Sequence, residues 1–120
     1  MKLVITSSGE HLDSQTELRF GRAKVFLYVD TDTNEKKFIT NAQNRNAVQG
    51  AGIQSGQHVV WLQPDCLITG HCGPKAFRVL SRAGIKVFLA DNGSVQDNID
   101  RFLKGQLEET LTADVEGHWV

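Results

Sequence analysis

A short apolar run followed directly by a glycine-rich turn is the feature that most restricts the fold of this chain. Residues Cys66–Thr69 are apolar enough for a buried strand, and segment 74–83 has the apolar spacing of an amphipathic helix. Gly70 and Gly73 permit a sharp turn, and Pro74 suits the first helical position because it has no N–H to leave unpaired. The sequence therefore predicts a strand, a tight turn and a helix in direct succession.

The turn also carries a thiol and an imidazole, Cys72 and His71, just before the predicted helix. A helix N-terminus has a partial positive charge and unpaired N–H groups, so it favours anions, and it lowers the pKa of a thiol. Thiolate is the preferred ligand of soft metals. We therefore expect an anionic, sulfur- or metal-containing ligand here, with Cys72 in a loop as the reactive thiol and Cys66 as a buried structural one. We expect no disulfide between them.

Strands dominate the first half of the chain, and strands alternate with helices in the second. Ser94 can cap a helix that has Asp97 in its first turn and ends at Gly105. Strand–helix alternation requires parallel crossovers, so we expect an α/β domain with a mixed five-stranded sheet, an antiparallel first half, a βαβα second half and helices on both faces. The expected strands are Lys2–Ser7, Val25–Asp30, 36–40, Cys66–Thr69 and 85–90, and the expected helices follow Gly52, span 74–83 and begin at Ser94.

The connecting segments define the limits of this domain. A loop of about five residues joins the first two hairpin strands, and the polar segment 8–22 is long for a compact domain, which favours a functional role. Residues 106–120 have little periodicity. We expect a single domain over residues 1–105 and a loosely attached tail over 106–120.

The charge balance excludes several classes of partner. Thirteen Lys and Arg against fourteen Asp and Glu give a formal charge of −1, with no cationic run of the kind that neutralises phosphates, so we expect no nucleic-acid partner. No apolar run approaches the roughly 20 residues that a bilayer span needs, and the first strand is too short for a signal peptide. We expect no membrane association and a cytoplasmic location.

Three motifs occur in one consistent order along residues 1–105: Phe20-Gly21-Arg22-Ala23, Gly50-Ala51-Gly52 and the Gly-His-Cys-Gly-Pro-Lys-Ala-Phe segment 70–77. In these motifs the chain resembles the dinitrogenase iron-molybdenum cofactor biosynthesis family. This family includes NifX-like proteins, the C-terminal domain of NifB-type proteins and the small orange proteins that hold a molybdenum-copper sulfide cluster. The resemblance implies a ribonuclease H-like fold and the binding, storage or transfer of a metal-sulfur cluster or its precursor, without catalysis.

The candidate site gathers residues from these three motifs. Arg22 can neutralise an anionic cluster, and glycine-rich turns before helices offer backbone amides. The expected cluster-binding residues are Cys72, His71, Arg22, Gly50, Gly52, Gly70 and Gly73, with Cys72 and His71 as metal ligands and with His11 and Asn46 as further candidates. We expect His58 and His118 to be solvated.

The number of soft ligands limits how a cluster can be held. An iron-sulfur cluster held by protein alone takes four thiolates, whereas this chain offers one loop cysteine and one adjacent histidine. We therefore expect labile binding of a preassembled molybdenum-iron or molybdenum-copper sulfide, through charge and hydrogen bonds. A thiomolybdate-like anion fits best, carried by a monomer or weak dimer between cluster donor and acceptor proteins.

Three other classes of function are alternatives to this carrier. A two-metal nuclease needs converging carboxylates, and neither Lys2–Ser7 nor Cys66–Thr69 contains one. A cysteine-dependent enzyme would use Cys72 as nucleophile with His71 or His11 as base. However, the adjacent His71 is poorly placed to act as that base, and the sequence indicates no carboxylate that would orient it. A cluster-free adaptor protein is the main alternative.

Overall fold

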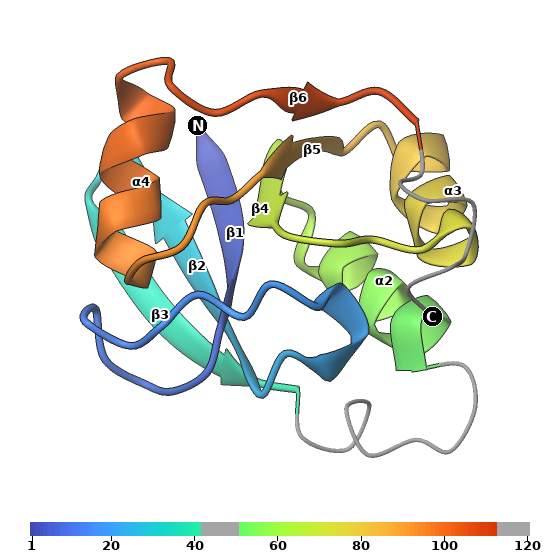
Figure 1. Cartoon of the computed structure of the whole chain (residues 1–120), viewed down its shortest axis with the longest axis horizontal. Helices are drawn as coiled ribbons and strands as arrows, with labels where there is room; N and C mark the ends of the chain where they lie inside the picture. Colours follow the sequence, from blue (N-terminus) through green and yellow to red (C-terminus); the bar gives the residue numbers. More distant parts are fainter. Residues whose placement is uncertain (42–50, 113–120) are drawn as a thin grey trace.

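The computed structural model describes residues 1–41 and 51–112, which form one mixed sheet covered by helices (Figure 1). The strands are β1 (Lys2–Ser7), β2 (Val25–Asp30), β3 (Glu35–Thr40), β4 (Cys66–Thr69), β5 (Lys86–Leu89) and β6 (Glu109–Thr110). The helices are the 3-10 helix η1 (Phe20–Arg22) and the α-helices α2 (Ala51–Leu62), α3 (Pro74–Arg82) and α4 (Val95–Leu103).

The sheet has the mixed topology that the sequence predicts, with β1 near its centre. Its strand order is β3-β2-β1-β4-β5-β6. β1 pairs antiparallel with β2 and parallel with β4, β2 pairs antiparallel with β3, and β4 pairs parallel with β5. Because β1 and β4 are parallel, their carboxyl ends meet at one edge of the sheet. The loop after β1 and the turn after β4 therefore lie close together.

The prediction of five strands is wrong, because β6 adds a sixth. β6 pairs antiparallel with β5, joining Val87 to Thr110 and Phe88 to Glu109. Two residues are too few to produce a detectable alternation of apolar and polar side chains. The strand lies inside the segment 106–120 for which no element was expected, and residues 113–120 of that segment lie outside the described residues.

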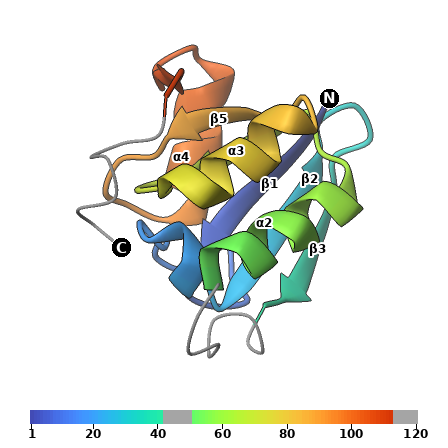
Figure 2. The ribbon, with the colours of Figure 1, turned by 90° about the vertical axis from the view of Figure 1, so that its right-hand side faces the viewer.

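The two faces of the sheet bury two separate apolar clusters. Successive side chains of a strand point to opposite faces, so Val4 packs under α2 and α3 while Leu3 and Ile5 pack under α4. Figure 2 shows α2 and α3 side by side on one face, with α4 on the other. The expectation of helices on both faces is confirmed. None of the helices in the described residues is long and apolar enough to cross a membrane.

Local sequence signals set several helix ends. Ser94 Oγ accepts a hydrogen bond from the Asp97 amide at 3.0 Å, and the Asp97 carboxylate accepts one from the Ser94 amide at 3.2 Å. Gly84 and Gly105 follow α3 and α4 with φ of 76° and 71°, a left-handed conformation that favours glycine. These caps stop each helix where the sequence predicts.

The hairpin turn between β2 and β3 has four residues instead of about five, because β3 begins at Glu35, which pairs with Asp30.

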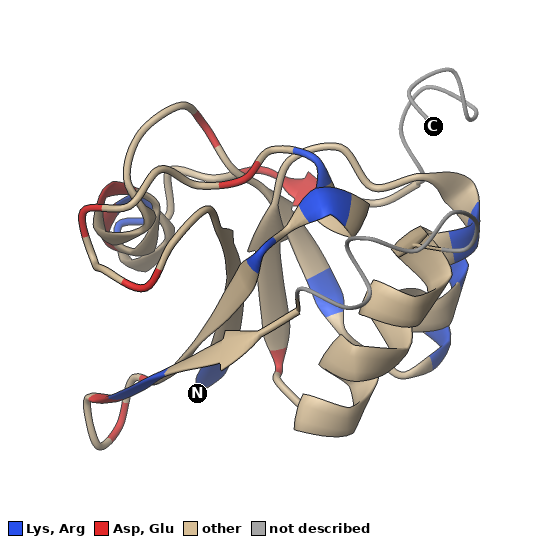
Figure 3. Cartoon of the chain, turned by 90° about the horizontal axis from the view of Figure 1, so that it is seen from below, with Lys and Arg blue, Asp and Glu red and all other residues tan. Residues whose placement is uncertain are grey.

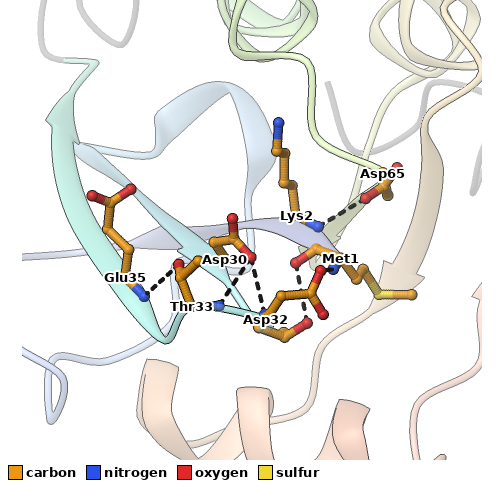
Figure 4. A network of polar contacts seen from close by, with 8 residues as sticks. Met1, Lys2, Asp30, Asp32, Thr33, Glu35 and Asp65 are labelled. Carbon is orange, nitrogen blue, oxygen red and sulfur yellow. Dashed lines mark hydrogen bonds and ion pairs between the residues drawn. The ribbon is translucent and has the colours of Figure 1, made fainter.

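Aspartates accept hydrogen bonds from the backbone at the amino end of β1 (Figure 4). The terminal amine of Met1 lies 2.9 Å from Asp32 Oδ2, and the Lys2 amide donates to Asp65 Oδ2 at 2.8 Å. The hydrogen bond to Asp32 raises the pKa of the Met1 amine. Because the Met1 amine and the Lys2 amide are already paired with carboxylates, this end of the sheet is poorly suited to hold an anionic ligand.

Candidate functional site

The turn after β4 is held tightly against the loop that follows β1. A side-chain carbon at position 70 would overlap the carbonyl of Leu18, so only glycine fits there. The His71 amide donates to the Leu18 carbonyl at 2.6 Å, and the Phe20 amide donates to the His71 carbonyl at 3.1 Å. Two segments about fifty residues apart in the chain thus form one ladder of hydrogen bonds at the carboxyl end of the sheet.

The same loop carries Arg22 to the start of α2. Arg22 ends the 3-10 helix η1 and its side chain is exposed. A side-chain carbon at Gly21 would lie 3.0 Å from the Gly52 nitrogen, so η1 packs directly on the backbone of the first turn of α2. The 3-10 helix η1, which ends at Arg22, therefore lies against the start of α2.

The start of α3 lies beside the start of α2. Gly73 is the N-cap of α3 and Pro74 opens the helix. A side-chain carbon at Gly52 would lie 3.5 Å from Cβ of Ala76, in the first turn of α3. Neither helix has an acidic residue in its first turn. Two positive helix ends therefore meet next to η1, with no carboxylate on either first turn to neutralise them.

The expectation of an accessible Cys72 is wrong. Cys72 lies in the loop before α3, as predicted, but only 1% of its surface is exposed, in the same buried cluster as Phe20 and Ala76. The adjacent His71 is exposed. The two adjacent residues therefore differ in their access to solvent.

Cys66 is a buried thiol, as the sequence predicts. It lies at the start of β4 with 4% of its surface exposed, and the two cysteines are not joined by a disulfide. Burial, and secondarily the neighbouring Asp65, raise the pKa of the Cys66 thiol. Cys66 is therefore a protonated structural residue at neutral pH. It lines a pocket of about 670 Å³ at the amino end of β4, opposite the end that carries Arg22.

The remaining candidates divide between another part of the molecule and undescribed residues. His11 is exposed in the loop 8–16, which is bonded to the start of α4: the Val95 amide donates to the Ser14 carbonyl at 2.9 Å. α4 covers the opposite face of the sheet from α2, so the structure does not bring His11 to the Arg22 region. Gly50 and Asn46 lie outside the described residues.

A buried polar network behind Arg22 was missed from the sequence. The side-chain amide of Asn41 donates to the Ala23 carbonyl at 2.9 Å and to Ser55 Oγ at 3.0 Å. Its oxygen lies 3.3 Å from Nδ1 of His58, whose ring packs edge-on against Phe26. The network links the end of η1 to the second turn of α2, and no local motif predicts it.

The prediction of a solvated His58 is wrong, because the ring is half-buried and desolvation lowers its pKa.

The charges around the site are segregated. η1, α2 and α3 contain arginines and one lysine but no Asp or Glu, whereas α4 contains two aspartates and one arginine. Figure 3 shows the blue segments at η1 and along α3 and red segments around α4. Within the described residues, no group of three or more His, Cys, Asp or Glu could hold a metal ion. The arrangement can therefore attract an anion by charge and amides, without a preformed coordination shell.

Comparisons with known proteins agree with this architecture. The sequence profile of the family described as dinitrogenase iron-molybdenum cofactor matches residues 1–105. An uncharacterised protein of Methanocaldococcus jannaschii is 33% identical over 93 residues, covering 75% of this chain and 78% of its own. The apo orange protein of Desulfovibrio gigas is 35% identical, with a TM-score of 0.88 over 92% of this chain and 93% of its own. A Thermotoga protein provisionally described as NifB is 34% identical, with a TM-score of 0.81 over 94% and 97% of the two chains.

Proposed function

Because this chain belongs to the dinitrogenase iron-molybdenum cofactor family, we propose that it binds, stores or transfers an anionic metal-sulfur cluster or its precursor. The cargo is a molybdenum-iron or molybdenum-copper sulfide. The protein acts as an accessory carrier without catalysis, as a monomer or weak dimer, between cluster donor and acceptor proteins in the cytoplasm. We also propose a ribonuclease H-like fold, which the mixed sheet with β1 between β2 and β4 supports.

One observation carries this proposal: the starts of α2 and α3 meet beside η1, which ends at Arg22, and neither first turn holds a carboxylate. A thiomolybdate-like anion already has its own sulfides, so it needs charge and N–H donors more than protein thiolates. Arg22 supplies the charge, and the amides around Gly52 and Gly73 supply the donors. Such contacts form no coordinate bond to the cargo, which suits reversible loading and release.

His71 and Cys72 have different parts in this proposal. His71 is exposed at the turn and can contact the anion directly. Cys72 can become a ligand only if the turn 70–73 opens, since its thiol is packed in the core. A cysteine-dependent enzyme is disfavoured by the same burial, because a nucleophile must reach its substrate.

The test is anaerobic titration of the apo protein with tetrathiomolybdate plus copper(I) and, separately, with an iron-sulfur precursor. We expect stoichiometric uptake and new charge-transfer absorption bands. Arg22→Ala should weaken binding about 10- to 150-fold, as a lost charge-assisted contact costs about 1.5–3 kcal/mol. The matched control Arg82→Ala removes an exposed arginine at the far end of α3 and should bind normally.

Cys72→Ser should retain uptake, because the thiol is buried when the protein folds. Loss of uptake in Cys72→Ser with normal uptake in Arg22→Ala would replace this proposal by a thiolate-dominated site. No stoichiometric uptake of either cargo would exclude the carrier function and leave the cluster-free adaptor.

A further inference from the structure

The exposed side of α2 carries no charge. Gln54, Gln57 and Trp61 follow a spacing of three and four residues, so they lie on one face of the helix, and all three are exposed. Trp61 leaves 78% of its surface in solvent. Tryptophan is highly buried on average, so this degree of exposure is unusual.

The exposed side of α3 is cationic. Lys75, Arg78 and Arg82 repeat the same spacing of three and four residues, and all three are exposed. The salt bridges of the described residues involve Met1, Arg19 and Lys37, so none includes a cation of α3. These three charges are therefore available to an acidic partner.

The two faces belong to one surface because α2 and α3 run parallel. Gly52 faces Ala76, and one turn later Gly56 faces Val79, so the helices advance in the same direction (Figure 2). We call this the α2–α3 surface: Gln54, Gln57, Trp61, Lys75, Arg78 and Arg82. It starts at the proposed cargo site, where both helices begin.

We propose that the α2–α3 surface docks the acidic surface of a protein that delivers or receives the cargo, an inference that rests on the proposed function. Tryptophan and arginine are the residues that most often dominate the energy of protein interfaces, and complementary charge speeds and orients encounter. Docking here would place the partner directly beside Arg22 and the helix starts.

The size of the surface fits a short-lived complex. A helix of 12 residues is about 18 Å long, and packed helices lie about 8–10 Å apart, so the patch is smaller than the roughly 800 Å² that each partner of a stable complex buries. A protein is favoured over a membrane because Trp61 is the one large exposed apolar residue of these two helices in the described chain. An interfacial membrane helix needs a continuous apolar face.

The test uses ¹⁵N-labelled apo protein and a short poly-glutamate peptide as the acidic probe, at low and at physiological salt. We expect saturable shifts of the α2 and α3 amides and of the Trp61 indole N–H, weaker at the higher salt. Arg78→Glu with Arg82→Glu should weaken binding about tenfold or more, and Trp61→Ala should weaken it less. Lys36→Glu with Lys37→Glu, an equal charge change on β3, should leave it unchanged.

Two outcomes would overturn the inference: shifts centred elsewhere on the protein, or equal peptide binding by the Arg78/Arg82 double variant. Binding of Trp61 to phosphatidylserine vesicles without binding to the peptide would also overturn it, in favour of a membrane surface. Tetrathiomolybdate uptake is measured separately on the same variants. In the protein without substitutions, normal uptake without peptide binding contradicts the docking surface alone, and peptide binding without uptake contradicts the proposed function alone.

Discussion

The start of α4 and the starts of α2 and α3 lie on opposite faces of one sheet and are built differently. At α4, the side chains of Ser94 and Asp97 satisfy each other's amides, and the loop 8–16 supplies carbonyls to the next ones: Val95 donates to Ser14 and Gln96 donates to Leu12. At α3, the N-cap is Gly73 and no acidic residue follows it. The start of α4 is neutralised by the protein itself, whereas the first turns of α2 and α3 hold no carboxylate.

This contrast separates residues that stabilise the domain from residues that serve the proposed site. The α4 side includes Asn98, which is fully buried and ties the long loop to the helix. The α2 and α3 side contributes exposed cations and glycines whose place is dictated by close backbone contact. Substitutions on the two sides should therefore affect different properties.

The largest expected effect is on stability, at Asn98. Its side chain donates to Thr16 Oγ1 at 2.8 Å and to the Asp91 carbonyl at 2.9 Å, and accepts from the Asp91 amide at 3.0 Å. Asn98→Ala leaves these buried groups unpaired and should lower the free energy of unfolding by about 2–3 kcal/mol. Urea denaturation followed by circular dichroism measures the change.

The matched control is Gln96→Ala, which removes the exposed contact of Gln96 with Asp100 and should change stability by less than about 0.5 kcal/mol. The folded Asn98→Ala protein should bind tetrathiomolybdate normally. Equal stability of the two variants, or a selective loss of binding in Asn98→Ala, would remove the division between the two faces.

An intermediate effect is expected when a charge is reversed at the start of α3. Lys75→Glu places a carboxylate in the first turn, where it should stabilise the helix by about 0.3–1 kcal/mol. The same carboxylate should repel the cargo and weaken tetrathiomolybdate binding about tenfold. Thermal melting and titration, run in parallel, should thus move in opposite directions.

Arg82→Glu makes the same charge change in the last turn of α3. There it should slightly destabilise the helix, because this end of the helix has the opposite polarity. Tetrathiomolybdate binding should be nearly unchanged. If both variants weakened binding equally, net charge rather than the helix start would govern affinity.

The smallest expected effect is a pH dependence from His58. Burial lowers its pKa in the folded state, so the unfolded chain binds the proton more readily. Stability should therefore be fully present above the unfolded pKa of about 6.5 and should fall as the pH drops below it, until the folded histidine also protonates. His58→Gln should flatten this part of a stability-against-pH curve. An unchanged curve in His58→Gln would assign the pH dependence to other groups.

Much of the fold could be predicted because its signals are local. The capping residues Ser94 and Asp97, the glycines that end α3 and α4, and Pro74 act within a few residues of themselves. For the site, the sequence indicated Arg22 and two helix starts, and the structure places η1, which ends at Arg22, against Gly52. The exposure of Cys72 was predicted wrongly, because a loop position in the sequence does not reveal which core lies beneath it.

The positions of most strands and helices, and the residue types at their ends, follow from the sequence alone, since backbone geometry, capping and apolar periodicity depend on near neighbours. Three features follow only from the folded arrangement: Cys72 is buried, Glu109 and Thr110 pair with β5, and Asn41 joins Ser55 to the end of η1. Each of these depends on packing or hydrogen bonding between segments far apart in the chain. Such contacts exist only once the sheet has brought those segments together.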